Sequence, residues 1–311
     1  MASYFLFTEV VRCGQIGIIA LRSFFTYHPN ETVHVFGLES DREAIAKLKN
    51  VIFHSLDKPS PELEGWSGFR RHASKKRLRQ IAKNFDHGHL GTASLWAYLI
   101  QTRPEEFIVH FDSDIVFRSS ALKDITEKLE SGYDLVGAPR AYKNNPNNRD
   151  DVRHLKDVTQ TFFFGFNKNK ISKHSYKILT KMCQGSYNPT GDPVIDFFDP
   201  VAFDILKNRG KIFFLSTDDY GGCDLNGSRT NKYPKVNALI DFGKKTAHFA
   251  AVGSGMNFYQ NHGQIKKVPN SYISYGLERY AVYIKLFYNK DIKIPIKIDQ
   301  YKPLFQVKKW Y

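Results

Sequence analysis

The chain has 311 residues and carries 45 Lys and Arg against 31 Asp and Glu, a formal net charge of +14 at pH 7. Its hydrophobic share of 42% and charged share of 24% are those of an ordinary globular protein, which excludes disordered and fibrous classes. Three cysteines are too few for a disulfide framework or a cysteine zinc site, so they favour a reducing compartment. The excess of positive charge indicates anionic partners rather than a particular fold.

The N-terminal segment does not look like a targeting signal. Glu9 and Arg12 interrupt its apolar run, and no basic region precedes that run. A window of about 18 uncharged apolar residues, the minimum for a transmembrane helix, does not occur in the sequence. We therefore expect a cytoplasmic protein without a cleaved leader or a membrane-spanning helix.

Short apolar runs alternate with helically spaced segments along the first half of the chain. Strands are expected at residues 3–11, 32–37, 51–54, 107–111 and 134–138. Helices are expected at residues 18–27, 40–50, 69–85 and 91–102. Strands and helices that alternate in this way predict an α/β domain with a parallel sheet.

A polar loop at residues 143–151 is the expected internal boundary of a single large domain. It would separate a nucleotide-binding half, about residues 1–142, from an acceptor-side half at about 150–265. A strand at 161–166, a helix at 199–208 and a strand at 211–215 are expected in the second half. The basic, aromatic tail at 266–311 either packs on the core or contacts an anionic membrane surface as a peripheral segment.

The strongest functional signal is a pair of carboxylates, Asp112 and Asp114, directly after the apolar strand at 107–111. In open α/β sheets, ligands bind beyond the carboxyl ends of the strands. A hard divalent ion such as Mg²⁺ takes one or two carboxylates together with phosphate oxygens of a substrate. The pattern therefore predicts a site for a divalent ion such as Mg²⁺ together with a nucleotide diphosphate, with a solvated turn as the alternative.

The run DHGHLGTA at residues 86–93, a helix and then FIVHFDSDIVF at 107–117 together resemble glycosyltransferases of the GT-A fold. The resemblance covers about residues 3–255 and implies a Rossmann-like, mixed but mainly parallel sheet flanked by helices. It implies that Asp112 and Asp114 hold the metal against a nucleotide-sugar diphosphate, with Ser113 and His89 beside the donor. It also implies a UDP- or GDP-sugar donor and a glycan, glycoprotein or glycolipid acceptor.

The segment at residues 246–255 (TAHFAAVGSG) resembles the late histidine segment of the same family. The resemblance implies that the imidazole of His248 is a third metal ligand. Neutral imidazole suits Mn²⁺ better than Mg²⁺. A lone histidine of this kind is also compatible with a purely structural role.

A carboxylate must take the proton of the attacking hydroxyl during transfer to the anomeric carbon. Asp199, at the start of the helix expected at 199–208, resembles the acidic helix start that carries this base in inverting members. Phe198 stands where that pattern has Glu, so Asp192 and Asp196 compete for the role. Asp199 followed by Pro200 also suits a helix N-cap, and the two roles can coexist.

Further donor contacts are expected on both sides of the carboxylate pair. Glu9 lies in the first expected strand, and Glu39 and Asp41 follow the second strand, where a carboxylate can bind a ribose hydroxyl. Arg71 and Lys75 lie in a basic segment and can contact the diphosphate, Arg71 with two parallel hydrogen bonds. For most residues of this basic segment, a solvated helix face is the expected role.

The sequence is also compatible with two other classes of function. A phosphatase of the haloacid dehalogenase type also places Asp-x-Asp after a strand, and a loop with Asp218 and Asp219 could supply its late acidic pair. Against it, Asp112 follows three strand and helix units, whereas that nucleophile usually opens the domain. Net charge +14 and 17 tyrosines permit a nucleic-acid-binding protein. Its charge is dispersed, however, so no nucleic-acid partner is expected.

Overall fold

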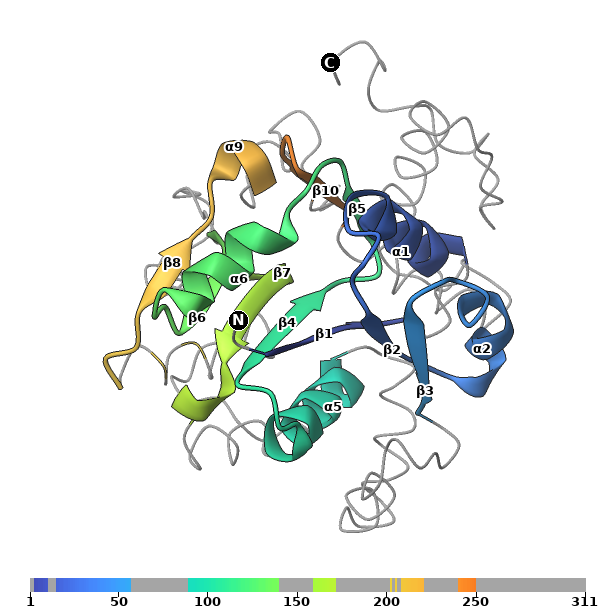
Figure 1. Ribbon diagram of the computed structural model, residues 1–311, viewed down its shortest axis with the longest axis horizontal. Coiled ribbons are helices and arrows are strands. Elements are labelled where there is room, and N and C mark those ends of the chain that lie inside the picture. Colours follow the sequence, from blue (N-terminus) through green and yellow to red (C-terminus); the bar gives the residue numbers. More distant parts are fainter. Residues whose placement is uncertain are drawn as a thin grey trace, which may run out of the picture.

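A computed structural model describes residues 3–10, 15–56, 89–139, 159–171, 202, 205, 208–220 and 240–249. Within these ranges the strands form a seven-stranded sheet and a three-stranded sheet (Figure 1). The large sheet contains, in spatial order, β3 (Val51–Ser55), β2 (Val33–Gly37), β1 (Tyr4–Glu9), β4 (Phe107–Phe111), β7 (Thr159–Asn167), β6 (Leu135–Pro139) and β8 (Ile212–Phe214). The small sheet contains β5 (Ile115–Phe117), β10 (Thr246–Phe249) and β9 (Ile240–Phe242).

Helices connect and cover the strands. The described helices are α1 (Gln15–Tyr27), α2 (Glu39–Ile45), α5 (His89–Thr102), α6 (Leu122–Glu130), α9 (Thr217–Tyr220) and the 3-10 helix η3 (Lys168–Lys170). None of these helices has the length and apolar character needed to cross a bilayer.

The large sheet is mixed but mainly parallel. Strand β1 pairs in parallel with β2 and β4, β2 with β3, and β8 with β6. Strand β7 is antiparallel to both β4 and β6. The fold class predicted from the sequence is therefore confirmed. Because β1 to β4 run in the same direction, their carboxyl ends meet at one edge of the sheet, where α/β proteins bind ligands.

Both faces of the sheet are covered. Helices α1 and α6 lie on one side of strands β1 and β4, and α5 lies on the other (Figure 1). On the α6 side, Leu122, Ile125 and Leu129 recur with helical spacing and are buried against the sheet. On the α5 side, the Trp96 indole stacks on Phe164 with 5.2 Å between ring centroids and an interplanar angle of 4°. This stacking packs α5 against β7 on the face of the sheet opposite α6.

Helix α6 approaches β7 closely because Gly165 has no side chain. A Cβ atom at Gly165 would lie 2.6 Å from Cγ2 of Ile125 and 2.9 Å from Cδ1 of Leu129. Contacts below 3.0 Å do not occur for real Cβ atoms, so a larger residue would push the helix away from the strand. The glycine thus sets the distance between the α6 layer and the sheet.

The histidine that follows α1, His28, caps α6. The residue before α6 is Ala121, whose side chain cannot accept a hydrogen bond. Nε2 of His28 accepts instead from the backbone N–H groups of Ala121 and Leu122, at 3.2 and 3.4 Å. Burial lowers the pKa of His28, which keeps the ring neutral and able to accept. This tertiary cap was not predicted from the sequence.

Helix α1 is also tied to the small sheet. The hydroxyl of Ser23 donates to the carbonyl of Ala20 at 2.7 Å and accepts from the backbone N–H of Phe117 at 3.0 Å. Phe117 ends β5, and all three groups are buried. One hydroxyl therefore joins the first helix to the strand that follows the carboxylate pair.

Two local predictions were wrong. The helix expected at 40–50 ends at Ile45, and Asn50 adopts a left-handed conformation with φ of 65°. The lysines expected to end that helix lie in the turns beyond it. Asp218 and Asp219 lie on the short helix α9 rather than in a loop. The predicted helix at 69–85, the boundary loop at 143–151 and the tail at 266–311 lie outside the described residues.

Candidate metal centre

The two acids occupy the link between the two sheets. Strand β4 ends at Phe111, and the chain then passes through Asp112 and Asp114 into β5. The backbone N–H of Asp112 donates to the carbonyl of Phe162 on β7 at 2.8 Å. The carbonyl of Asp114 accepts from the backbone N–H of Phe249 on β10 at 3.1 Å. Strands from both sheets therefore hold the backbone of this link.

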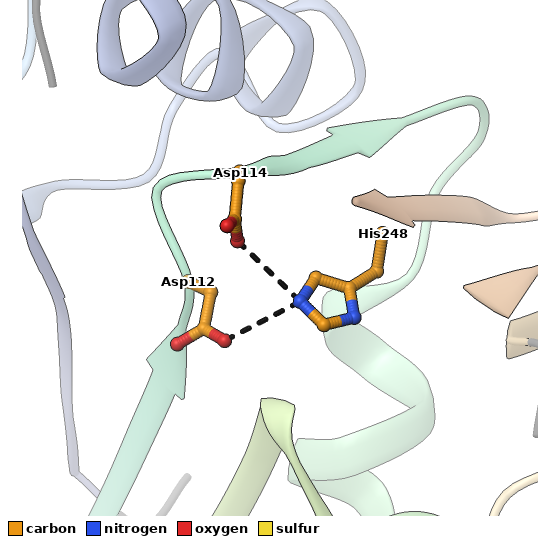
Figure 2. Close-up of side chains that lie close together, drawn as sticks. All are labelled: Asp112, Asp114 and His248. Carbon is orange, nitrogen blue, oxygen red and sulfur yellow. Dashed lines mark ion pairs between the residues drawn. The ribbon is translucent and has the colours of Figure 1, made fainter. Parts of the chain in front are cut away.

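Strand β10 brings a histidine to the same place. It pairs antiparallel with β5, and His248 lies opposite Ile115, the residue after Asp114. Nε2 of His248 is 3.4 Å from Oδ1 of Asp114 and 3.5 Å from Oδ2 of Asp112 (Figure 2). One potential ligand atom from each of the three residues lies within 4.8 Å of the others. The predicted metal-ligand residues therefore come together in space.

The cluster is closed on the protein side and open at Asp112. The side chains of Asp114 and His248 are each 8% exposed, whereas that of Asp112 is 35% exposed. A fully enclosed structural site would not leave one ligand accessible in this way. A divalent ion shared between protein carboxylates and substrate oxygens requires an accessible side.

Two aromatic rings lie directly behind the ligands. The imidazole of His248 stacks on the ring of Phe162, with 4.5 Å between centroids and an interplanar angle of 16°. Nδ1–H of His110 donates to the carbonyl of Thr161 at 3.2 Å, and its Nε2 lies 3.8 Å from Oδ1 of Asp112. Burial lowers the pKa of His110 to about 3. His110 is therefore neutral and supplies no positive charge to balance Asp112.

These residues fit a divalent metal ion. Carboxylates suit Mg²⁺ and Mn²⁺, and imidazole is a ligand of transition metals. Neighbouring ligand atoms around an octahedral ion with bonds of about 2.1 Å lie about 3 Å apart. The distances of 3.4 and 3.5 Å from His248 to the two carboxylates are close to that spacing.

The other predicted donor contacts have protein partners at the edge of the sheet. Glu9, which ends β1, accepts a hydrogen bond from the indole Nε1 of Trp96 at 3.1 Å. Glu39 accepts from Nε of Arg42 at 2.9 Å, and Asp41 accepts from the backbone N–H of Leu38 at 3.0 Å. The last two acids lie in the first turn of α2, where negative charge is stabilising. Their predicted contacts with a donor stay predictions.

Two further predicted donor residues lie within the described ranges. Ser113 lies in the link between the two acids, and His89 is the first residue of α5. The remaining candidates lie outside the described ranges: Arg71, Lys75, Asp192, Asp196 and Asp199.

The acidic pair required by the phosphatase hypothesis is not part of the cluster. Among the residues that the structure describes, the group able to hold a metal comprises Asp112, Asp114 and His248 alone. Asp218 and Asp219 instead receive hydrogen bonds at their backbone carbonyls from the N–H groups of Lys244 and Lys245, at 2.8 and 2.7 Å. Through these bonds α9 supports the turn that leads into β10.

Sequence reasoning did not identify His110 or Phe162. For His110 a signal was present, because residues two apart on a strand point to the same face and His110 is two residues before Asp112. For Phe162 no local signal exists among the neighbouring phenylalanines of β7. Its place behind His248 depends on the register of β7 with β4 and on the small sheet.

No family model and no curated protein matches the chain. Similar solved structures include mouse xyloside xylosyltransferase 1 in its apo form, at 14% identity and a TM-score of 0.47, with 78% of this chain and 96% of that one covered. The galactosyltransferase LgtC with donor and acceptor sugar analogues has 15% identity and a TM-score of 0.38, covering 70% and 74%. A 4-diphosphocytidyl-2C-methyl-D-erythritol synthase from Anaerococcus prevotii has 13% identity and a TM-score of 0.36, covering 68% and 88%.

Proposed function

We propose that this chain is a metal-dependent glycosyltransferase. It moves a sugar from a nucleotide-diphosphate donor, a UDP- or GDP-sugar, to a hydroxyl of a glycan, glycoprotein or glycolipid. The observation that carries the proposal is the convergence of Asp112, Asp114 and His248 at the carboxyl end of β4. The open side of the cluster at Asp112 is where diphosphate oxygens would complete the shell around an ion.

The chemistry of this transfer matches the residues of the cluster. When bound, Mn²⁺ or Mg²⁺ would supply Lewis-acid stabilisation of the charge that develops on the departing diphosphate. Asp112, Asp114 and His248 would hold that ion. Their backbones are fixed by β7 and β10, so the ligands would be in place before the donor arrives.

The acceptor hydroxyl must lose its proton as the new bond forms, and we propose Asp199 as the base, with inversion at the anomeric carbon. Asp192 and Asp196 are the alternatives. The variant Asp199→Asn should bind the donor normally and lose roughly 10²-fold in turnover. Normal turnover in Asp199→Asn would transfer the role to Asp192 or Asp196, or to a retaining route without a base.

The donor side is proposed to include residues around the cluster. Glu9 at the end of β1, and Glu39 and Asp41 in the first turn of α2, are candidates for contact with the nucleoside. Ser113 and His89 are candidates for the diphosphate, together with Arg71 and Lys75. The basic tail at 266–311 is a candidate for contact with an anionic membrane that carries a lipid-linked acceptor.

A thermal-shift screen of UDP-, GDP- and dTDP-sugars with and without MnCl2 tests the proposal. A ligand that binds only the folded state adds about 2.7 kcal/mol of stability at a hundredfold excess over Kd. One donor class should stabilise the protein in the presence of Mn²⁺, and Asp114→Asn should abolish the effect. Asp218→Asn is the matched control, because Asp218 is exposed and outside the cluster.

The same variants distinguish the proposed glycosyltransferase from a phosphatase. A glycosyltransferase should release nucleoside diphosphate from the preferred donor, at equal rates in the wild type and in Asp218→Asn. Melting curves unmoved by every donor, combined with hydrolysis of an aryl phosphate that Asp218→Asn impairs, would replace the proposal with the phosphatase.

A further inference from the structure

Phe162 on β7 lies behind the metal-ligand cluster and contacts two of its members. We propose that Phe162 is a positioning residue, whose ring orients the imidazole of His248 so that Nε2 faces Asp112 and Asp114. The inference rests on the proposed function only in requiring that the cluster bind a divalent ion. According to this inference, the apolar side chain of Phe162 contributes to the affinity of the cluster for that ion.

The ring contact defines the plane of the imidazole. The two rings lie 4.5 Å apart between centroids and only 16° from parallel. An imidazole is free to rotate about its Cβ–Cγ bond unless its faces are packed. In this orientation Nε2 lies at nearly equal distances, 3.4 and 3.5 Å, from the two carboxylates. Groups that fix the orientation of a ligating histidine raise metal affinity, because the ligand need not be ordered on binding.

The backbone of Phe162 also contacts a second residue of the cluster, Asp112. Its carbonyl accepts the N–H of Asp112 at 2.8 Å, which prolongs the pairing of β4 with β7 by one residue. Any substitution at Phe162 keeps this carbonyl. A change of side chain therefore removes the contact with His248 while the hydrogen bond to Asp112 is retained.

The ring acts through His248 rather than on a substrate. Phe162 is 1% exposed, so its side chain does not reach the open side of the cluster at Asp112. A role in positioning rather than in direct contact follows from this burial.

Binding of MnCl2 alone, measured by isothermal titration calorimetry, tests the inference without any donor. Phe162→Leu should bind Mn²⁺ about tenfold more weakly than the wild type, the loss seen when a group that orients a metal ligand is removed. Phe162→Met is the second variant, since its flexible side chain fills the space without a flat ring. Circular dichroism and the melting temperature show that each variant is folded.

Phe166→Leu is the matched control. Phe166 lies on the same strand, is completely buried and stacks on Trp96 with 5.6 Å between centroids and an angle of 23°. Its replacement removes a comparable aromatic contact at a distance from the cluster. Phe166→Leu should lower the melting temperature and leave the affinity for Mn²⁺ within about twofold of the wild type, because distant sites act independently.

A double-mutant cycle with His248→Asn decides whether Phe162 acts through the histidine. In the His248→Asn background, Phe162→Leu should not weaken Mn²⁺ binding further. An equal loss in both backgrounds, or wild-type affinity in Phe162→Leu and Phe162→Met, would overturn the inference alone. A wild type whose Mn²⁺ binding is absent, or is the same in Asp114→Asn, would overturn the proposed metal site and this inference with it.

Discussion

The backbone N–H of Phe249 donates a hydrogen bond to the carbonyl oxygen of Asp114, at 3.1 Å. Phe249 follows His248 on β10, so the strand that carries the histidine is bonded directly to the acid that the histidine faces. The alignment of His248 with Asp114 is therefore fixed by backbone pairing. Substitution of either side chain should alter metal binding without displacing the other.

Asp114→Asn should separate metal binding from stability. The amide of the introduced asparagine is neutral. The Mn²⁺ affinity measured by calorimetry should therefore fall at least tenfold, which is the loss expected when a group that only orients a metal ligand is removed. Without metal, the melting temperature should stay the same or rise, because the variant removes one of two neighbouring carboxylates. A variant that unfolds at a lower temperature while binding Mn²⁺ normally would show that Asp114 has a structural role.

Ser23→Ala should destabilise the protein by about 1–3 kcal/mol, because the buried N–H of Phe117 loses its acceptor. Thr26→Ala on the same helix is the control. Thr26 also donates to a helix carbonyl, that of Arg22 at 2.9 Å, but it is exposed. Urea unfolding should give a change within about 0.5 kcal/mol for Thr26→Ala. Equal losses in the two variants would mean that the tie to β5 is unimportant.

Gly165→Ala should cost about 1–3 kcal/mol by overpacking the contact between β7 and α6. Ile125→Ala removes the nearest obstructing atom and is itself destabilising through the space it leaves. Because the added methyl group would partly fill that space, the double variant should lose less stability than the two single losses added together. Strict additivity in urea unfolding would contradict the contact.

Stability should fall in mild acid because of two histidines on neighbouring strands. Nδ1 of His34 on β2 lies 2.8 Å from Nε2 of His54 on β3. Burial, reinforced by the nearby Arg103 guanidinium, lowers the pKa of each ring to about 4, and Arg42 adds to the effect at His54. Glu105 opposes the shift at His34 without reversing it.

Stability decreases on acidification because the unfolded state binds protons at a higher pH than the folded state. Unfolded histidines take up protons near pH 6.5, whereas the folded pair stays neutral down to about pH 4. The pair's share of stability is therefore full above about pH 6.5 and decreases as the pH falls toward 4, by up to about 1.4 kcal/mol per pH unit for each histidine. Urea unfolding at pH 7.5 and 5.0 should show a smaller fall for His34→Asn than for the wild type. An identical fall in the two proteins would exclude the pair as its source.

The sequence was a good guide where the signal is local. An apolar run followed by Asp112 and Asp114 is sufficient to predict a strand that ends in two carboxylates, and alternating strands and helices are sufficient to predict the mixed α/β sheet. The end of α2 was misplaced because lysines at 47 and 49 are typical of a helix C-terminus, whereas the chain had already turned after Ile45.

The rest depends on pairings between distant segments. His248 was predicted from a family resemblance, but its approach to the acids requires the antiparallel pairing of β5 with β10, which no local pattern determines. The cap that His28 provides to α6 requires the residue that follows α1 to lie at the start of α6. The stacking of Phe162 on His248 requires both sheets to be in place.

The position of β10 so late in the chain has a consequence for biosynthesis. Strands β1 to β4 and both aspartates leave the ribosome long before Thr246 is added, and pairings over such sequence distances form slowly. A polypeptide halted before β10 would carry the two carboxylates without the imidazole. The complete cluster of Asp112, Asp114 and His248 therefore forms only after nearly all of the described architecture has been translated.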